Sequence, residues 1–156
     1  MNFITTLLLI VFFNFIVLKV YTIDIPKDLI VKIIEESENE ENTISKNLDL
    51  ISVKYTGWVF DSNASTNNYC DAKGKMFDSN ILDKFHHTEP FQFVLGKGIV
   101  IKGWDLGLQD MRINEQRCLI IPPHFAYGNR RIGNIIKPNS TLIFEVKLLK
   151  ILKVKK

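Results

Sequence analysis

Residues 100–111 read VIKGWDLGLQDM, and they contain the pattern from which the expected fold follows. The apolar side chains of Trp104, Leu108 and Met111 follow an i, i+4, i+7 spacing. Side chains with this spacing share one face of an α-helix. We therefore expect one short helix over residues 103–111, and it is the only convincing helix after residue 22.

Segments on both sides of this helix have the composition of β-strands. Residues 50–60 are rich in β-branched and aromatic side chains, and residues 91–95 and 142–152 alternate between apolar and polar ones. Shorter extended segments are expected at 29–36, 75–77 and 116–121, with loops at 61–71 and 124–138. Several antiparallel strands and one short helix predict an α+β domain.

The composition limits the number of domains and the class of partner. A chain of 156 residues suits one domain, and its 46% apolar and 24% charged residues exclude wholesale disorder. The net charge of +3 falls to +2 without residues 1–22, which contain one lysine and no acid. So small an excess excludes a broad electrostatic surface for nucleic acid.

Residues 3–18 (FITTLLLIVFFNFIVL) carry no charge. The run is shorter than the ~20 apolar residues that span a bilayer, and it fits the apolar centre of a signal peptide better. We expect residues 1–22 to be a cleaved secretory signal and residues 23–156 to be the domain, located in the ER lumen or secreted. An uncleaved membrane anchor and a buried core helix are the alternatives.

Two features bear on an exported protein. Asn63 and Asn139 each begin an Asn-X-Ser/Thr triplet, which makes both candidates for glycosylation. Cys70 and Cys118 could form a disulfide in an oxidising compartment. However, Cys70 lies in a polar stretch and Cys118 in an expected strand, so we expect two free thiols, with a disulfide as the alternative.

Groups for acid–base, nucleophilic or metal chemistry are few. His86 and His87 lie in a polar insertion that we interpret as a solvated loop. The sequence has no serine in a nucleophile elbow, no glycine-rich phosphate loop and no metal-ligand spacing of Cys and His. The residues that stand out are aromatic and are spread over several elements.

Five short motifs occur in order along the chain. They are Tyr55-Thr56-Gly57, Phe77-Asp78-Ser79, Val100-Ile101-Lys102-Gly103-Trp104-Asp105, Ala126-Tyr127-Gly128 and Leu142-Ile143-Phe144-Glu145-Val146. Together they closely resemble the FKBP-type peptidyl-prolyl cis-trans isomerases, over residues 29–152. This resemblance implies a curved antiparallel sheet wrapped around one short helix, with an apolar active-site cavity between them.

The resemblance also implies site residues. The expected catalytic set is Tyr55, Asp78, Trp104, Tyr127 and Phe144, and the expected substrate-binding set is Phe77, Phe91, Val100, Ile101 and Ile136. Trp104 would be the floor for the proline ring, and Tyr127 would donate from its hydroxyl. Asp78, held by Tyr55, would lie near the twisting amide, and Ile101 would offer its backbone N–H.

The implied partners are proline-containing polypeptide clients and rapamycin-like macrolide inhibitors, with a monomeric enzyme that uses no cofactor. A binding module that grips proline-containing segments without turnover is the alternative. The chain departs from the family pattern by insertions at 61–71 and 81–89 and by Phe125 and Ile132, where well-known members have other residues. The second insertion and Ile132 border the expected pocket, so they bear on substrate choice and drug affinity.

Overall fold

The computed structural model describes residues 23–37 and 43–152. The predicted signal peptide, part of the acidic run and the last four residues lie outside the described residues. The strands are β1 (Ile30–Glu35), β2 (Leu50–Phe60), β3 (Lys73–Ser79), β4 (Phe91–Val94), β5 (Gln116–Ile121) and β6 (Leu142–Leu152). The helix is α1 (Lys102–Gly107), and the 3₁₀ turns are η1 (Tyr69–Asp71), η2 (Asp83–Phe85) and η3 (Pro123–Phe125).

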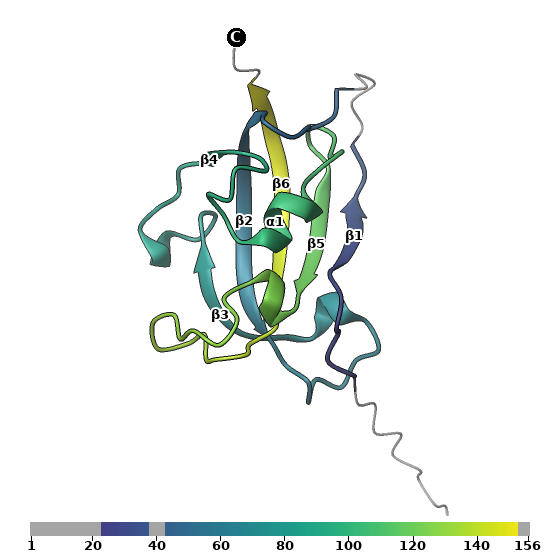
Figure 1. Ribbon diagram of the computed structural model, residues 1–156, viewed down its shortest axis with the longest axis vertical. Coiled ribbons are helices and arrows are strands. Elements are labelled where there is room, and N and C mark those ends of the chain that lie inside the picture. Colours follow the sequence, from purple (N-terminus) through teal and green to yellow (C-terminus); the bar gives the residue numbers. More distant parts are fainter. Residues whose placement is uncertain (1–22, 38–42, 153–156) are drawn as a thin grey trace, which may run out of the picture.

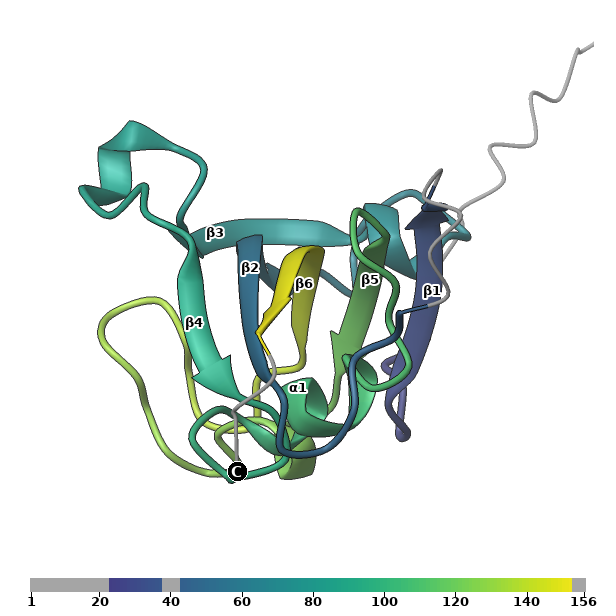
Figure 2. The same ribbon diagram turned by 90° about the horizontal axis from the view of Figure 1, so that it is seen from above.

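All six strands join one antiparallel sheet. The order is β1-β5-β6-β2-β3, and β4 pairs with the other half of β2. The long central strands β2 and β6 pair along almost their whole length. Helix α1 crosses one face of this sheet (Figure 1), and the view from above shows β4 and β1 on either side of it (Figure 2). The predicted α+β class, with a curved sheet around one short helix, is confirmed.

The expected strands agree with the structure to within about two residues at each end, and 50–60, 116–121 and 142–152 agree at both ends. The helix is shorter than predicted, because it ends at Gly107 and the chain turns between Leu108 and Met111. The guanidinium of Arg117 accounts for this ending, since it donates to the carbonyls of Gly107, Gln109 and Asp110. Trp104, Leu108 and Met111 are all buried, as the spacing predicted.

Two glycines let α1 lie very close to β5. A Cβ built on Gly103 would come within 2.4 Å of the Ile121 side chain, and one on Gly107 within 2.9 Å of Leu119. Real Cβ atoms do not approach other atoms so closely, so larger residues at these positions would push the helix away from the sheet. The helix position, and with it the position of Trp104, therefore depends on these glycines.

The expectation of two free thiols is wrong, because Cys70 and Cys118 form a disulfide. The polar residues around Cys70 fold into the 3₁₀ turn η1, where the Asn68 side chain accepts the Cys70 N–H at 3.2 Å. This turn places Cys70 against β5, in an apolar cluster on the face of the sheet opposite α1. Phe60 and Ile120 belong to the same cluster. Local composition could not reveal this contact.

No helix within residues 23–37 and 43–152 is long and apolar enough to cross a membrane.

The disulfide leads to a stability prediction. The bridge joins residues 48 positions apart, so its reduction should lower the free energy of unfolding by about 2–4 kcal/mol through the freedom that the unfolded chain regains. Urea unfolding with and without dithiothreitol measures this as a lower midpoint. A Cys70→Ala/Cys118→Ala variant is the control and should not respond to the reductant. Equal midpoints for the oxidised and reduced wild type would contradict the prediction.

Candidate active site

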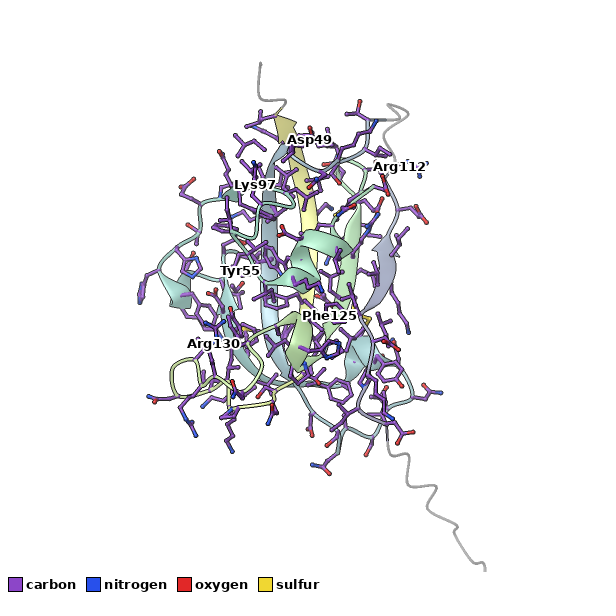
Figure 3. The ribbon with its side chains drawn as sticks, viewed as in Figure 1. Asp49, Tyr55, Lys97, Arg112, Phe125 and Arg130 are labelled. Atoms are coloured by element: carbon purple, nitrogen blue, oxygen red, sulfur yellow. A yellow bond between two sulfur atoms is a disulfide. The ribbon has the colours of Figure 1, made fainter. Side chains whose placement is uncertain are left out.

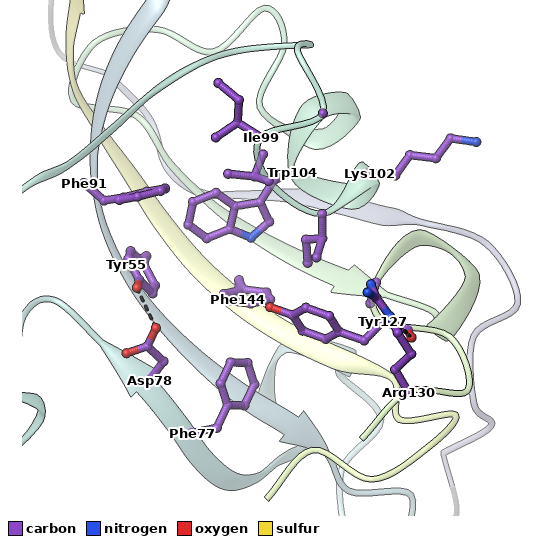
Figure 4. A pocket seen from close by; sticks show the side chains of 14 residues that line it. Tyr55, Phe77, Asp78, Phe91, Ile99, Lys102, Trp104, Tyr127, Arg130 and Phe144 are labelled. Atoms are coloured by element: carbon purple, nitrogen blue, oxygen red, sulfur yellow. Dashed lines mark hydrogen bonds between the residues drawn. The ribbon is translucent and has the colours of Figure 1, made fainter. Parts of the chain in front are cut away.

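A pocket of about 520 Å³ opens between α1, the central strands and the loop after η3 (Figure 4). Tyr55 on β2 and Arg130 in that loop lie on the same side of the molecule (Figure 3). The lining residues are Tyr55, Phe77, Asp78, Phe91, Gly98, Ile99, Val100, Ile101, Lys102, Trp104, Ala126, Tyr127, Arg130 and Phe144. The pocket therefore collects residues from four strands (β2, β3, β4 and β6), from α1 with the loop before it, and from the loop after η3.

Aromatic rings form the floor and walls. Trp104 is buried, and its ring meets Tyr55 and Phe144 edge-on at centroid distances of 5.1 and 5.2 Å. Phe77 meets Phe144 edge-on at 5.4 Å, and Phe91 closes the other side at 6.2 Å from Trp104. Edge-to-face pairs are favoured by the ring quadrupoles, so these contacts lock the rings in place. The result is a rigid apolar surface.

Gly57 on β2 makes room for two of these rings. A Cβ on this residue would lie within 2.8 Å of both Phe77 and Phe144. The rings of Phe77 and Phe144 thus pack directly against the backbone of β2 at Gly57. Any side chain at position 57 would displace the rings and change the shape of the pocket wall.

One carboxylate, that of Asp78, lies in the wall. The Tyr55 hydroxyl donates to its Oδ2 at 2.6 Å, and the Ser79 backbone N–H donates to its Oδ1 at 2.9 Å. The Nε2 atom of His87 lies 2.8 Å from the same Oδ1. The predicted pairing of Tyr55 with Asp78 is therefore present, and the carboxylate is held in one orientation.

Two tyrosines provide hydroxyl groups at the pocket. Burial, together with the hydrogen bond and the negative charge of Asp78, raises the pKa of Tyr55 well above its ordinary value. Burial also raises the pKa of Tyr127, with a further contribution from Asp78 and an opposing one from Arg130. Both hydroxyls stay protonated at neutral pH. The Tyr127 hydroxyl points into the middle of the pocket and can donate to a ligand carbonyl (Figure 4).

The loop that leads into α1 forms the upper rim. The carboxylate of Asp105 accepts the backbone N–H groups of Gly96 and Gly98 at 2.8 and 2.9 Å. The loop is thereby tied to the helix that it precedes. None of the hydrogen bonds among the described residues uses the N–H of Ile101, which follows this loop. That N–H is available to a ligand, as the family resemblance implied.

Trp104 carries a polar atom without an acceptor. Its indole Nε1 is buried and makes no hydrogen bond within the described part of the chain. A buried donor of this kind is costly unless a partner or the face of an aromatic ring lies near it. The rings of Tyr55 and Phe144 both pack edge-on against the indole.

Nearly all of the predicted site residues meet at this pocket. The exception is Ile136, which is buried in the main core and pairs with Ile132 across the loop instead of lining the cavity. The residues that sequence reasoning missed are Gly98, Ile99, Lys102, Ala126 and Arg130. Lys102 and Ala126 belong to the quoted motifs, so they could have been predicted as lining residues from the site residues next to them. Arg130 lies in a long irregular loop where no periodic pattern exists.

The two insertions lie on different sides. Residues 61–71 are mostly irregular, as predicted, and reach the second apolar cluster through η1, away from the pocket. Residues 81–89 reach the pocket wall through the contact of His87 with Asp78, and none of them lines the cavity itself. The interpretation of His87 as a solvated loop residue was incomplete, because its ring is about half exposed yet contacts Asp78. Asp78 sits at the base of this loop, so the contact is between segments nine residues apart.

The remaining candidates lie on the surface. Asn63 and Asn139 are both exposed, and Asn139 adopts a left-handed backbone conformation with φ of 60°. Ile132 is exposed on the loop after η3 and Phe125 is half buried beneath the Lys102 amine, so neither of them lines the cavity. Within residues 23–37 and 43–152, no group of three or more His, Cys, Asp or Glu side chains is placed to hold a metal ion.

Comparison with known proteins identifies the family. A family model described as FKBP-type peptidyl-prolyl cis-trans isomerase matches residues 41–149. The chain belongs to this family. Its FKBP-type sheet, helix and pocket agree with what the five sequence motifs implied.

Three of the relatives are named as FK506-binding proteins. The chain is 47% identical over 103 residues to FK506-binding protein 2B of Rhizopus delemar, a match that covers 66% of this chain and 42% of that protein. It is 53% identical over 83 residues to FK506-binding protein 1A of Neurospora crassa, covering 53% and 66%. It is 38% identical over 121 residues to FK506-binding protein 1 of Saccharomyces cerevisiae, covering 78% and 92%. The chain thus spans less than two thirds of the first two relatives.

The Asp105 contacts lead to a prediction about the pocket rim. In an Asp105→Ala variant the Gly96 and Gly98 amides lose their acceptor, so they should exchange with deuterium about tenfold faster, which corresponds to about 1.4 kcal/mol. Amide-resolved hydrogen exchange measures this. An Asp110→Asn variant changes the other acid near the helix and should leave both amides unchanged. Equal exchange in Asp105→Ala and wild type would mean that the carboxylate does not hold the loop.

Proposed function

We propose that this protein is a peptidyl-prolyl cis-trans isomerase. The observation that carries the proposal is a rigid aromatic pocket, with Trp104 at its floor and the hydroxyl of Tyr127 aimed into it. Family membership supports the same activity. No pattern in the sequence indicated a catalytic nucleophile or a metal site, and this reaction needs neither.

The chemistry follows from the nature of the bond. Rotation about a peptide bond crosses a barrier of about 18–20 kcal/mol because the planar amide has resonance. X–Pro bonds therefore exchange in tens to hundreds of seconds without a catalyst. The twisted amide has lost that resonance and is less polar than the planar one. A pocket of aromatic rings favours the twisted form over the planar form, and only such a difference raises the rate.

Each group has a distinct part in this proposal. The proline ring packs on Trp104, and Phe77, Phe91 and Phe144 exclude water from the twisting bond. The Tyr127 hydroxyl and the Ile101 N–H hold the carbonyl groups that flank it. Every ~1.4 kcal/mol by which the pocket prefers the twisted state gives a tenfold faster rate.

A binding module is the second candidate. The same pocket could hold an extended proline-containing segment without accelerating its isomerisation. The retained Tyr55–Asp78 pair favours an enzyme, because a purely apolar grip has no need of an oriented carboxylate beside the bond. Peptide binding without acceleration of cis-trans exchange would select the module.

Turnover should depend on the Tyr127 hydroxyl. A Tyr127→Phe variant loses one hydrogen bond worth about 0.5–1.5 kcal/mol, so kcat/KM for a proline tetrapeptide should fall about two- to tenfold. A protease-coupled assay measures this. Tyr69→Phe removes a hydroxyl on the far side of the sheet, in η1, and should keep wild-type turnover. If Tyr127→Phe is as active as Tyr69→Phe, Tyr127 has no part in the reaction.

We also propose that the protein works as a monomer in the secretory pathway, where it assists the folding of proline-containing clients. The uncharged run at 3–18, the Cys70–Cys118 disulfide and the two exposed acceptor asparagines support this location. An uncleaved, membrane-anchored form is the second candidate. Because the relatives bear the name FK506-binding protein, we further propose that the pocket accepts FK506- and rapamycin-like macrolides.

Export can be tested on protein purified from a secreting eukaryotic host. We expect the chain to begin near Ile23 and to lose mass at Asn63 and Asn139 when treated with an N-glycosidase. Intact-mass and peptide mass spectrometry measure both. Asn63→Gln and Asn139→Gln variants assign each glycan to its site. A chain that begins at Met1 would rule out the cleaved signal.

A further inference from the structure

The 81–89 insertion brings an imidazole to the carboxylate in the pocket wall. The Nε2 atom of His87 lies 2.8 Å from Oδ1 of Asp78, and Oδ2 of the same carboxylate accepts from Tyr55. We propose that His87 sets the net charge of this wall and thereby determines how well the protein accepts acidic or basic residues beside the substrate proline. The inference rests on the proposed isomerase function.

The base of the insertion is held firmly. The Asn80 side chain donates to the carbonyls of Val53 and Glu89 at 3.0 and 3.1 Å, so it ties both ends of the insertion to β2. The Lys54 amine donates to the carbonyls of Asn80 and Thr88. These bonds fix the backbone at both ends of the insertion, next to His87, whose Nε2 lies 2.8 Å from Oδ1 of Asp78.

Several charged or titratable groups lie in the same insertion as His87, on the strands beside it or at the pocket that Asp78 lines. They are Lys54 and Tyr55 on β2, Asp78 on β3, Asp83, Lys84, His86 and Glu89 in the insertion, and Tyr127 and Arg130 across the pocket. Lys54 is engaged with backbone carbonyls, and the Arg130 guanidinium contacts the carbonyl of Tyr127 at 3.5 Å. Within the described residues, His87 is the one basic side chain that pairs with Asp78.

The charge of the wall therefore follows the protonation of one ring. With His87 neutral, Asp78 presents an uncompensated negative charge near the reacting bond, which attracts lysine or arginine in the substrate and repels glutamate or aspartate. With His87 protonated, the pair is neutral and the penalty on acidic residues falls. Imidazole is the side chain whose charge ordinarily changes between pH 5 and 8. The His87 ring is 47% exposed, so solvent screens the pair and its effect on substrate preference is moderate.

The experiment compares tetrapeptides that carry Glu, Leu or Lys before proline, at pH 8 and pH 5.5. For the wild type, the ratio of kcat/KM for the Glu peptide to that for the Lys peptide should rise about two- to fivefold as the pH falls, the range that partly exposed ion pairs give. In His87→Gln this ratio should stay nearly constant, and the Leu peptide serves as the uncharged reference. Titration of the peptides themselves affects every variant equally, so it cancels when the pH response of a variant is compared with that of the wild type.

His86 offers a matched control. It precedes His87, is exposed and has a left-handed backbone with φ of 59°, a conformation that asparagine also adopts readily. His86→Asn should therefore keep the wild-type response to pH. If His87→Gln keeps that response as well, His87 does not set the charge of the wall and the inference is wrong.

A second readout separates this inference from the isomerase proposal. Absence of turnover with every peptide would overturn the isomerase function alone. In a Trp58→Phe background Trp104 is the only tryptophan, so its fluorescence reports binding of the same peptides. A Glu-to-Lys affinity ratio that changes with pH in this background, and not after His87→Gln, supports the role of His87. An equal change in both overturns it.

Discussion

The close contact between helix α1 and strand β5 is the constraint on which the rest of the structure depends. It exists because Gly103 and Gly107 present no side chain to Ile121 and Leu119. Arg117 completes it by binding the carbonyls at the end of the helix. A six-residue helix has little stability of its own, so its position comes from this packing. The consequence is a tryptophan held at a fixed depth as the floor of the pocket.

Most polar groups of the pocket lie at its rim and wall and not at its centre. The Asp105 carboxylate ties the rim loop to the helix, and Asp78 is held by Tyr55 and by the backbone of Ser79. Each carboxylate has its partners within the protein, so neither requires the substrate to satisfy it. The centre of the pocket is left to aromatic rings and to the Tyr127 hydroxyl. This division between an oriented polar frame and an apolar centre suits a reaction that breaks no covalent bond.

Much of this arrangement could be predicted from the sequence, for identifiable reasons. A periodic pattern of apolar residues shows which face of an element is buried. Such patterns are present in residues 142–152, which alternate, and in the spacing of Trp104, Leu108 and Met111. Most of the pocket residues belong to the five motifs, so the family resemblance implied them as site residues. Ile136 was implied by the resemblance alone, and its irregular loop has no periodic pattern that could have shown that the side chain lies in the core.

The expectation of free thiols was wrong, and the interpretation of His87 as a solvated loop residue missed one contact. Neighbours in the chain made Cys70 look solvated, yet η1 folds it against β5 and the disulfide forms there. His87 likewise looked solvated, and its contact with Asp78 depends on how Asn80 and Lys54 close the insertion. Neither contact leaves a local pattern, because each is decided by the path of an irregular segment across the sheet. Such contacts become visible only in the three-dimensional structure.

The most direct test of the central claim is exchange NMR on a proline tetrapeptide with a small molar fraction of the protein. This experiment observes the cis and trans forms at equilibrium, with no coupled protease. If the pocket favours the twisted amide, the exchange rate should rise in proportion to the protein concentration while the cis-to-trans ratio stays unchanged. Binding of the peptide with exchange at the uncatalysed rate would contradict the account and leave a pocket that only grips proline.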